Sequence, residues 1–158
     1  MINKKYEFVD GDTIEHNGKT LRRIRAIASI GLLVSSGDLG GYIESESNLT
    51  LVGNAWVYGN AQVHGDARVY GDARVESDKS IFWATKVGND NATLTAFKNK
   101  DGQITLVRGC FIGSIDEFKA ASAKKHDART MREYELLIDV ARSRILDEEF
   151  EVKNDTKI

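Results

Sequence analysis

Three histidines and one cysteine are the side chains of this chain that could serve as a general base or a nucleophile. His64 directly follows Val63, which we expect to point inward, so the imidazole should face outward. His16 lies beside a predicted hairpin turn and His126 at a predicted helix end, and neither position requires a function. Cys110 lies in an apolar segment, where we expect a small buried hydrophobic residue rather than a nucleophile.

No recognised catalytic motif accompanies these residues. The sequence contains no GxSxG, Walker, HExxH or Cys/His metal-ligand pattern. Asp66, Asp72 and Asp78 recur every six residues, but we expect them on three different sides of a coil, where they cannot converge on one ion. The sequence therefore predicts no metal and no cofactor.

Aromatic and charged residues that lie eighteen positions apart in the repeat form a candidate binding surface. In a coil of about eighteen residues per turn, Trp56 would lie beside Arg74 and Tyr58 beside Glu76. Aromatic side chains mixed with charges are typical of interface centres. We expect these four residues to form a subunit interface, with ligand or partner recognition and a plain solvated face as the alternatives.

A run of cations near the N-terminus is a second candidate surface. Alternation along a strand places Arg23 and Arg25 on one face and Arg22 on the other, and Lys19 precedes them. Three arginines could bind a phosphate-bearing ligand. They could equally offset the acidic stretch at positions 147–149.

Composition limits the function classes. The net charge of −2 gives no general attraction to nucleic acid or to an anionic membrane. No apolar run has the length of a signal peptide core or a membrane span, and a single cysteine allows no intrachain disulfide. We therefore expect a cytoplasmic protein that binds no membrane.

The middle of the chain is a tandem repeat. It reads LVGNAW, VYGNAQ, VHGDAR and VYGDAR, with an aliphatic residue every six positions from Leu51 to Ile81. Alanine lies four positions after each of the first four, and the pattern ends at Lys79. A period of six fits no helix, whereas short strands joined by Gly-Asn or Gly-Asp bends explain every position. Weaker units extend the repeat to residues 39–80, which makes about 2.3 coils.

These units resemble the left-handed β-helix hexapeptide-repeat family. The resemblance implies a triangular coil with valine and alanine inside. Many members are acyltransferases that use a histidine as base at a subunit groove, which here would be His64. The whole chain also resembles small phage and prophage β-helix proteins, often labelled polymer-forming cytoskeletal, for which the resemblance implies no catalytic motif.

The flanks are predicted to cap the coil. Asn17-Gly18 predicts a two-residue turn between strands at 13–16 and 19–27, and a second hairpin is expected from strands at 91–97 and 104–108. Helices are expected at about 115–126 and 131–148, each beginning with a capping box, at Ser114 and Thr130. The sequence thus predicts three segments: an N-terminal hairpin cap at 1–38, the repeat at 39–86, and a C-terminal cap of a hairpin and two helices at 87–158.

The sequence thus predicts a mainly β fold with C-terminal helices: a short left-handed β-helix between an N-terminal hairpin and a C-terminal hairpin plus two α-helices. The preferred function is a non-catalytic, oligomeric binding protein of phage type, most simply a trimer. Its partner would be a host protein or a nucleotide ligand, in counter-defence by occluding a host complex or sequestering a nucleotide signal. The alternative is an acyltransferase with His64 as base.

Overall fold

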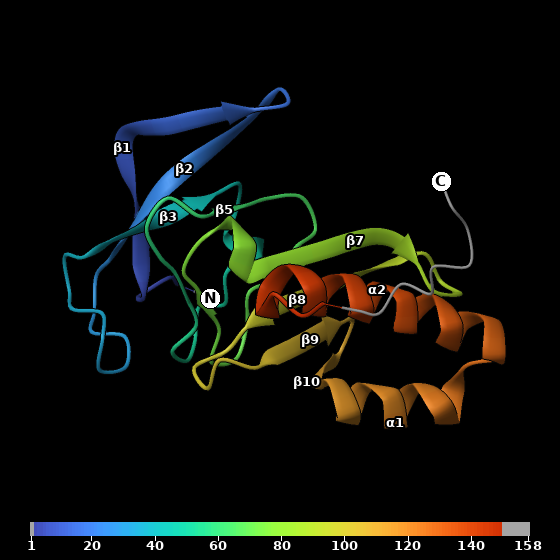
Figure 1. Ribbon diagram of the computed structural model, residues 1–158. Coiled ribbons are helices and arrows are strands. Elements are labelled where there is room, and N and C mark those ends of the chain that lie inside the picture. The colour runs from blue at the N-terminus through green and yellow to red at the C-terminus, as the bar shows by residue number, and fades with distance from the viewer. Residues whose placement is uncertain (1, 150–158) are drawn as a thin grey trace.

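The computed structural model describes residues 2–149, so the last part of the predicted 87–158 segment, residues 150–158, lies outside it. The fold is mainly β with two C-terminal helices, as predicted (Figure 1). The strands are β1 (Tyr6–His16), β2 (Lys19–Ala26), β3 (Leu39–Ile43), β4 (Trp56–Val57), β5 (Gln62–Val63), β6 (Arg74–Val75), β7 (Ile81–Val87), β8 (Ala92–Lys98), β9 (Ile104–Arg108) and β10 (Phe111–Ser114). The helices are α1 (Ile115–Lys125) and α2 (Ala128–Leu146).

The N-terminal hairpin is confirmed. β1 and β2 pair antiparallel with His16 opposite Lys19, and the turn residues Asn17 and Gly18 have φ values of 50° and 79°. Both positive values are those of a type I′ turn, which matches the twist of the strands. The register of this pair shifts between Phe8 and Thr13, so β1 bulges there. The sheet continues in the order β1-β2-β3-β5.

The repeat positions are buried as predicted. The inward aliphatic residues from Val57 to Ile81 and the alanines between them are at most 3% exposed. Trp56 pairs with Arg74 in a parallel bridge eighteen positions away, as the period requires. These parallel pairings are only two residues long, and the two four-stranded sheets are not solenoid sheets, so the left-handed β-helix stays a prediction.

The start of the repeat differs from its predicted register. Leu49 bridges Val69, and Ile43 pairs with Val63, so the spacing here is twenty positions rather than eighteen. Leu51 was expected inside but is only half-buried. The reason is the short helical turn at Glu46–Asn48, where buried Asn48 donates to the carbonyls of Gly65 and Ala67 and holds the longer turn in place.

The second sheet, in the order β10-β9-β8-β7, is larger than the predicted hairpin. β8 and β9 are confirmed, whereas β7 and β10 were not predicted as partners. Its two faces belong to two cores: Phe97 and Val107 pack with the repeat, and Leu94 and Leu106 pack with the helices. The sheet therefore lies between the repeat and the helices, as Figure 1 shows.

Both helices form close to their predicted positions. Ser114 and Glu117 make the predicted capping box of α1. The prediction for α2 is wrong by one turn, because Asp127 is the N-cap and its carboxylate accepts from the Thr130 amide at 2.8 Å. No helix in residues 2–149 combines the length and the apolar character needed to cross a membrane.

Candidate functional site: the histidine cleft

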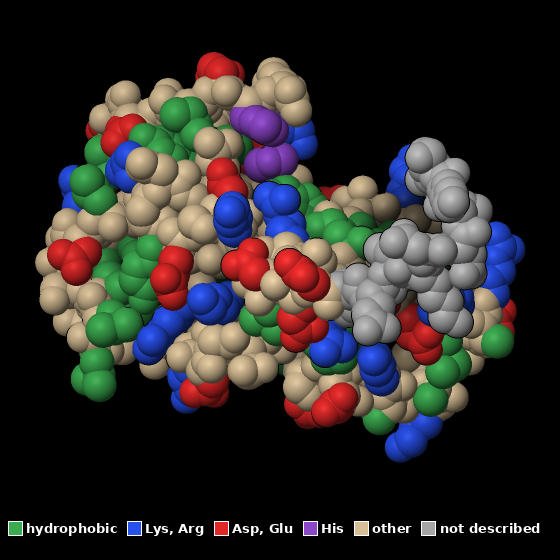
Figure 2. All heavy atoms as spheres, viewed as in Figure 1, with side chains coloured by type: hydrophobic (Ala, Val, Ile, Leu, Met, Phe, Trp, Pro, Cys, Tyr) green, Lys and Arg blue, Asp and Glu red, His purple; other side chains and the backbone are tan. Residues whose placement is uncertain are grey.

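An open cleft of about 300 Å³ brings together parts of the chain that are distant in sequence. We call it the histidine cleft. It lies between the tip of the β1–β2 hairpin, the corner after β5, the start of β7 and the last turn of α2, and Figure 2 shows the two imidazoles side by side at the recess. Its lining residues are His16, Gln62, His64, Asp78, Ile81, Phe82, Trp83 and Arg144.

Three rings meet in this cleft. The ring centroids of His16 and His64 are 4.7 Å apart with 41° between their planes. The indole of Trp83 meets His64 edge to face, with centroids 4.9 Å apart. Each ring occupies a fixed place because His16 ends β1 before a tight turn, His64 directly follows β5, and Trp83 lies in β7. The contact of His16 with His64 also fixes the hairpin tip against the repeat.

Burial and nearby cations keep His64 neutral at pH 7. Loss of solvent lowers the pKa of His64, and the charges of His16 and Lys19 lower it further, while Glu44 and Asp78 oppose the shift. A neutral imidazole is an acceptor as well as a donor, and it stacks without the cost of desolvating a charge.

Two cations border these rings. Arg144 lines the cleft, and its Nη2 donates to the backbone oxygen of Asp78 at 3.3 Å. Within residues 2–149 the other donors of the guanidinium have no partner. Lys19, whose side chain is 48% exposed, lies 3.6 Å from Glu44. The cleft thus combines aromatic walls with cations at its edge.

The geometry gives little support to catalysis by His64. A histidine base normally donates its second N–H to an acceptor that fixes the ring, and within residues 2–149 the His64 ring makes no hydrogen bond to a side chain or backbone group. The same residues hold no group of three His, Cys, Asp or Glu side chains able to bind a metal.

The predicted interface residues are only partly on the surface. Trp56 is 1% exposed and packs against Tyr6 with ring centroids 6.3 Å apart, so its predicted outward orientation is wrong. The N-terminal hairpin covers this side of the repeat, which the hexapeptide pattern alone does not indicate. Tyr58 and Arg74 are partly exposed and Glu76 is exposed. Burial raises the pKa of Tyr58, the charge of Arg74 opposes this shift and that of Glu76 adds to it.

The arginines of the predicted anion site have partners within the chain, and Arg23 has the most. Its five N–H groups donate to Asp12, the Gly40 and Gly59 carbonyls, the Tyr42 hydroxyl and Asn60, so none is left for a ligand. The other two arginines also have partners within the chain, since Arg22 lies over the Phe8 ring at 3.6 Å and Arg25 pairs with Glu7 at 2.8 Å. These partners are not the acidic stretch at 147–149 that the alternative invoked.

Sequence reasoning missed most of the cleft. His64 was singled out, but its neighbours His16, Trp83 and Arg144 were not joined to it, because they meet only through tertiary contacts. The one available signal is the outward position of His64 next to a hairpin that ends in another histidine. Cys110, predicted buried, is exposed in the tight turn between β9 and β10, where Gly109 has a φ of 57°.

No protein-family model matches this sequence, and no curated protein matches it.

Proposed function

We propose that this chain is a non-catalytic binding protein that holds a nucleotide in the histidine cleft. The observation that carries the proposal is the convergence of His16, His64 and Trp83 with Arg144 in one open cleft. Ring faces and edges bind a planar base, with about 1–3 kcal/mol per stacked base. Arginine and lysine bind phosphate oxygens.

The size and openness of the cleft favour a small ligand. A volume of about 300 Å³ accommodates one mononucleotide or one half of a dinucleotide rather than a polymer. The carboxylates of Asp78 and Glu44 nearby oppose a long polyphosphate chain and would favour a ligand with few charges.

The repeat would be the scaffold that positions His64. Parallel bridges between Leu49 and Val69, Trp56 and Arg74, and Ile43 and Val63 support a coil over 39–86, and we propose that this coil is the left-handed β-helix of the hexapeptide family. A rigid coil fixes the direction of its outward side chains.

The proposed assembly is an oligomer, with a trimer preferred. Burial of Trp56 removes one aromatic anchor from the expected interface, so Tyr58, Arg74 and Glu76 would carry the contact. Light scattering after size exclusion tests this assembly. A counter-defence role in a phage or prophage would consist of sequestering a nucleotide signal, which needs binding and no turnover.

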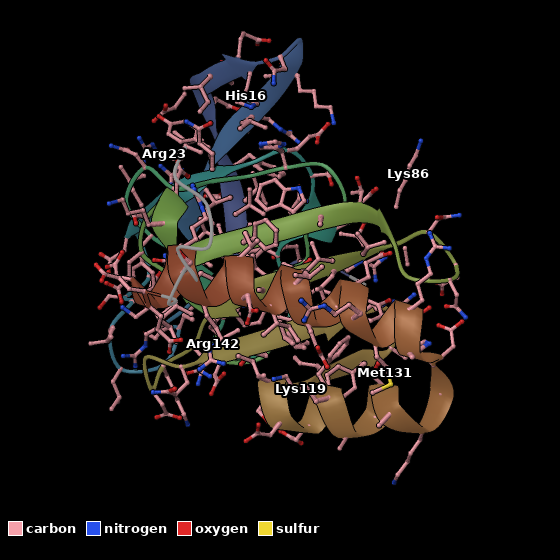
Figure 3. All side chains as sticks on the ribbon, turned by 45° about the vertical axis from the view of Figure 1, so that its right-hand side comes forward. His16, Arg23, Lys86, Lys119, Met131 and Arg142 are labelled. Carbon is pink, nitrogen blue, oxygen red and sulfur yellow. The ribbon has the colours of Figure 1, made fainter. Side chains whose placement is uncertain are left out.

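Isothermal titration of the whole chain with AMP, GMP, CMP and UMP tests the binding proposal. We expect saturable binding of at least one nucleotide, weakened about fivefold or more by His16→Ala and by Arg144→Gln. Arg142→Gln is the matched control, because Arg142 lies on the same helix but pairs with Glu148 outside the cleft (Figure 3). Absence of binding, or binding that neither cleft variant alters, overturns the proposal.

The alternative function is an acyltransferase with His64 as base. It is supported only by the resemblance of the repeat and by the neutral state of His64. It predicts transfer of an acetyl group from acetyl-CoA to an amine or hydroxyl acceptor and loss of that activity in His64→Ala. Retention of acetyl-CoA without turnover would instead favour nucleotide binding.

A further inference from the structure

A second cavity, of about 290 Å³, lies between the β9–β10 turn and the second half of α1. We call it the Arg108 cavity. It shares no lining residue with the histidine cleft. Figure 1 shows that α1 begins where β10 ends and lies below β9 in this view. The cavity opens to solvent where Cys110 and Lys125 are exposed.

Three side chains that line this cavity carry buried polar atoms without a hydrogen-bond partner among the described residues. They are Arg108 Nε, Ser122 Oγ and His126 Nδ1. Ser122 is only 6% exposed, so its hydroxyl has little access to bulk solvent that could replace the missing hydrogen-bond partner. Because an unsatisfied buried polar atom costs about 1–3 kcal/mol, three at one cavity leave polar groups there for water or a ligand to satisfy.

Two cations, Arg108 and Lys125, and one carboxylate, Asp90, line the cavity, so its net charge favours an anionic partner. Arg108 has a side chain 13% exposed and pairs with Asp90 through Nη2, while its Nε has no hydrogen-bond partner among the described residues. Lys125, in the last turn of α1, adds a second cation at the rim. An arginine N–H can only donate, and a hydroxyl and an imidazole can donate as well, so the three unpartnered atoms together match an oxyanion.

Aromatic rings form the remaining wall. Phe118 is 4% exposed and meets Phe111 edge to face with ring centroids 5.3 Å apart. Both rings line the cavity. A ligand with a small apolar body and one anionic group would satisfy the polar atoms and cover the rings at the same time.

We propose that the Arg108 cavity binds a small organic oxyanion, a carboxylate or a phosphate monoester, on Arg108, Ser122 and His126. The site is separate from the histidine cleft, and either proposal can fail without the other. The apolar part of the ligand lies against Phe111 and Phe118. Bound ligand shields the Cys110 thiol at the rim.

Cys110 supplies a built-in reporter because it is the single cysteine of the chain. The test measures the rate at which a disulfide reagent modifies this thiol in the presence of benzoate or phenyl phosphate. Benzyl alcohol, similar in shape and uncharged, is the matched control ligand. We expect saturable protection by at least one of the two anions and none by the alcohol.

Two variants separate a binding role from a structural one. Ser122→Ala removes the unpartnered hydroxyl, so the fold should be as stable or more stable, while the half-saturating anion concentration should rise about threefold or more. Lys125→Gln should also weaken protection, and Lys124→Gln, an exposed neighbour that does not line the cavity, should not. No saturable protection, equal protection by benzyl alcohol, or unchanged protection in Ser122→Ala overturns the proposal.

Discussion

Gly88 has a conformation and a neighbour that strongly disfavour any other residue. Its φ is 76°, and a Cβ at this position would overlap the hydroxyl of buried Tyr134. Its amide donates to Glu133 at 2.7 Å, so the turn after β7 is fixed to α2. The contact therefore joins the second sheet to the helix that covers it.

Gly88→Ala should lower the free energy of unfolding by about 3 kcal/mol, from backbone strain and overpacking together. Gly109→Ala is the control, because Gly109 has a φ of 57° but no neighbour within reach of a Cβ. It should cost about 1 kcal/mol from strain alone. Urea denaturation measures both, and equal losses would contradict the proposed overlap with Tyr134.

His64 should make stability depend on pH. Its pKa in the folded chain lies below the ordinary histidine value of about 6.5, so on acidification the unfolded chain takes up the proton first. The free energy of unfolding should therefore fall as the pH falls below about 6.5, and the loss should continue down to the folded-state pKa. The groups that face the ring are His16, Lys19, Glu44 and Asp78.

Thermal denaturation between pH 7.5 and 5 measures this dependence. In His64→Gln the decrease in Tm over this range should be smaller than in the unmodified chain. The same decrease in both proteins would show that other groups, not His64, carry the dependence.

Arg23 holds three parts of the fold together. Its five hydrogen bonds connect the β1 bulge, β3 and the corner at Gly59. Arg23→Lys keeps the charge but cannot reproduce this planar set of donors, and it should cost about 3 kcal/mol. Arg22→Lys, at the exposed neighbouring position over Phe8, should cost less than about 1 kcal/mol. Denaturant midpoints compare the two, and similar costs would contradict the role of Arg23.

Two residues are candidates for the N-cap of α2: Asp127, which caps it in the structure, and Thr130, which the sequence predicted. Asp127→Ala should lower stability by about 1 kcal/mol because the Thr130 amide loses its acceptor. Thr130→Ala should change stability by less than about 0.5 kcal/mol. Urea denaturation compares the two variants. A larger loss in Thr130→Ala than in Asp127→Ala would instead support the cap predicted from Thr130 to Glu133.

Local signals predicted most elements of this fold. Asn17-Gly18 fixed the first hairpin, and Ser114 with Glu117 fixed the start of α1, since turns and caps depend on neighbouring residues. β7 was missed because Ile81 also fits the last unit of the repeat, and only pairing with β8 shows that a long strand begins there. Trp56 fitted the outward position of its unit, and its burial depends on a hairpin fifty residues earlier in the chain.

In the whole molecule, the second sheet separates two hydrophobic cores. Each candidate site lies where separate elements of the fold meet. The histidine cleft lies where the hairpin, the repeat and α2 meet, and the Arg108 cavity lies where α1 meets the β9–β10 turn. The cleft residues His16, His64, Trp83 and Arg144 come from parts of the chain that are far apart in sequence, so no sequence pattern could join them. A binding function therefore depends on the complete fold.

The most direct test of the central claim is equilibrium dialysis of the whole chain against the mononucleotides, followed by chromatography of the recovered ligand. The account predicts saturable retention at one site, with the nucleotide recovered unchanged, and loss of retention in the His16→Ala, Arg144→Gln double variant. Failure to retain any nucleotide, or recovery of a converted product, would contradict it.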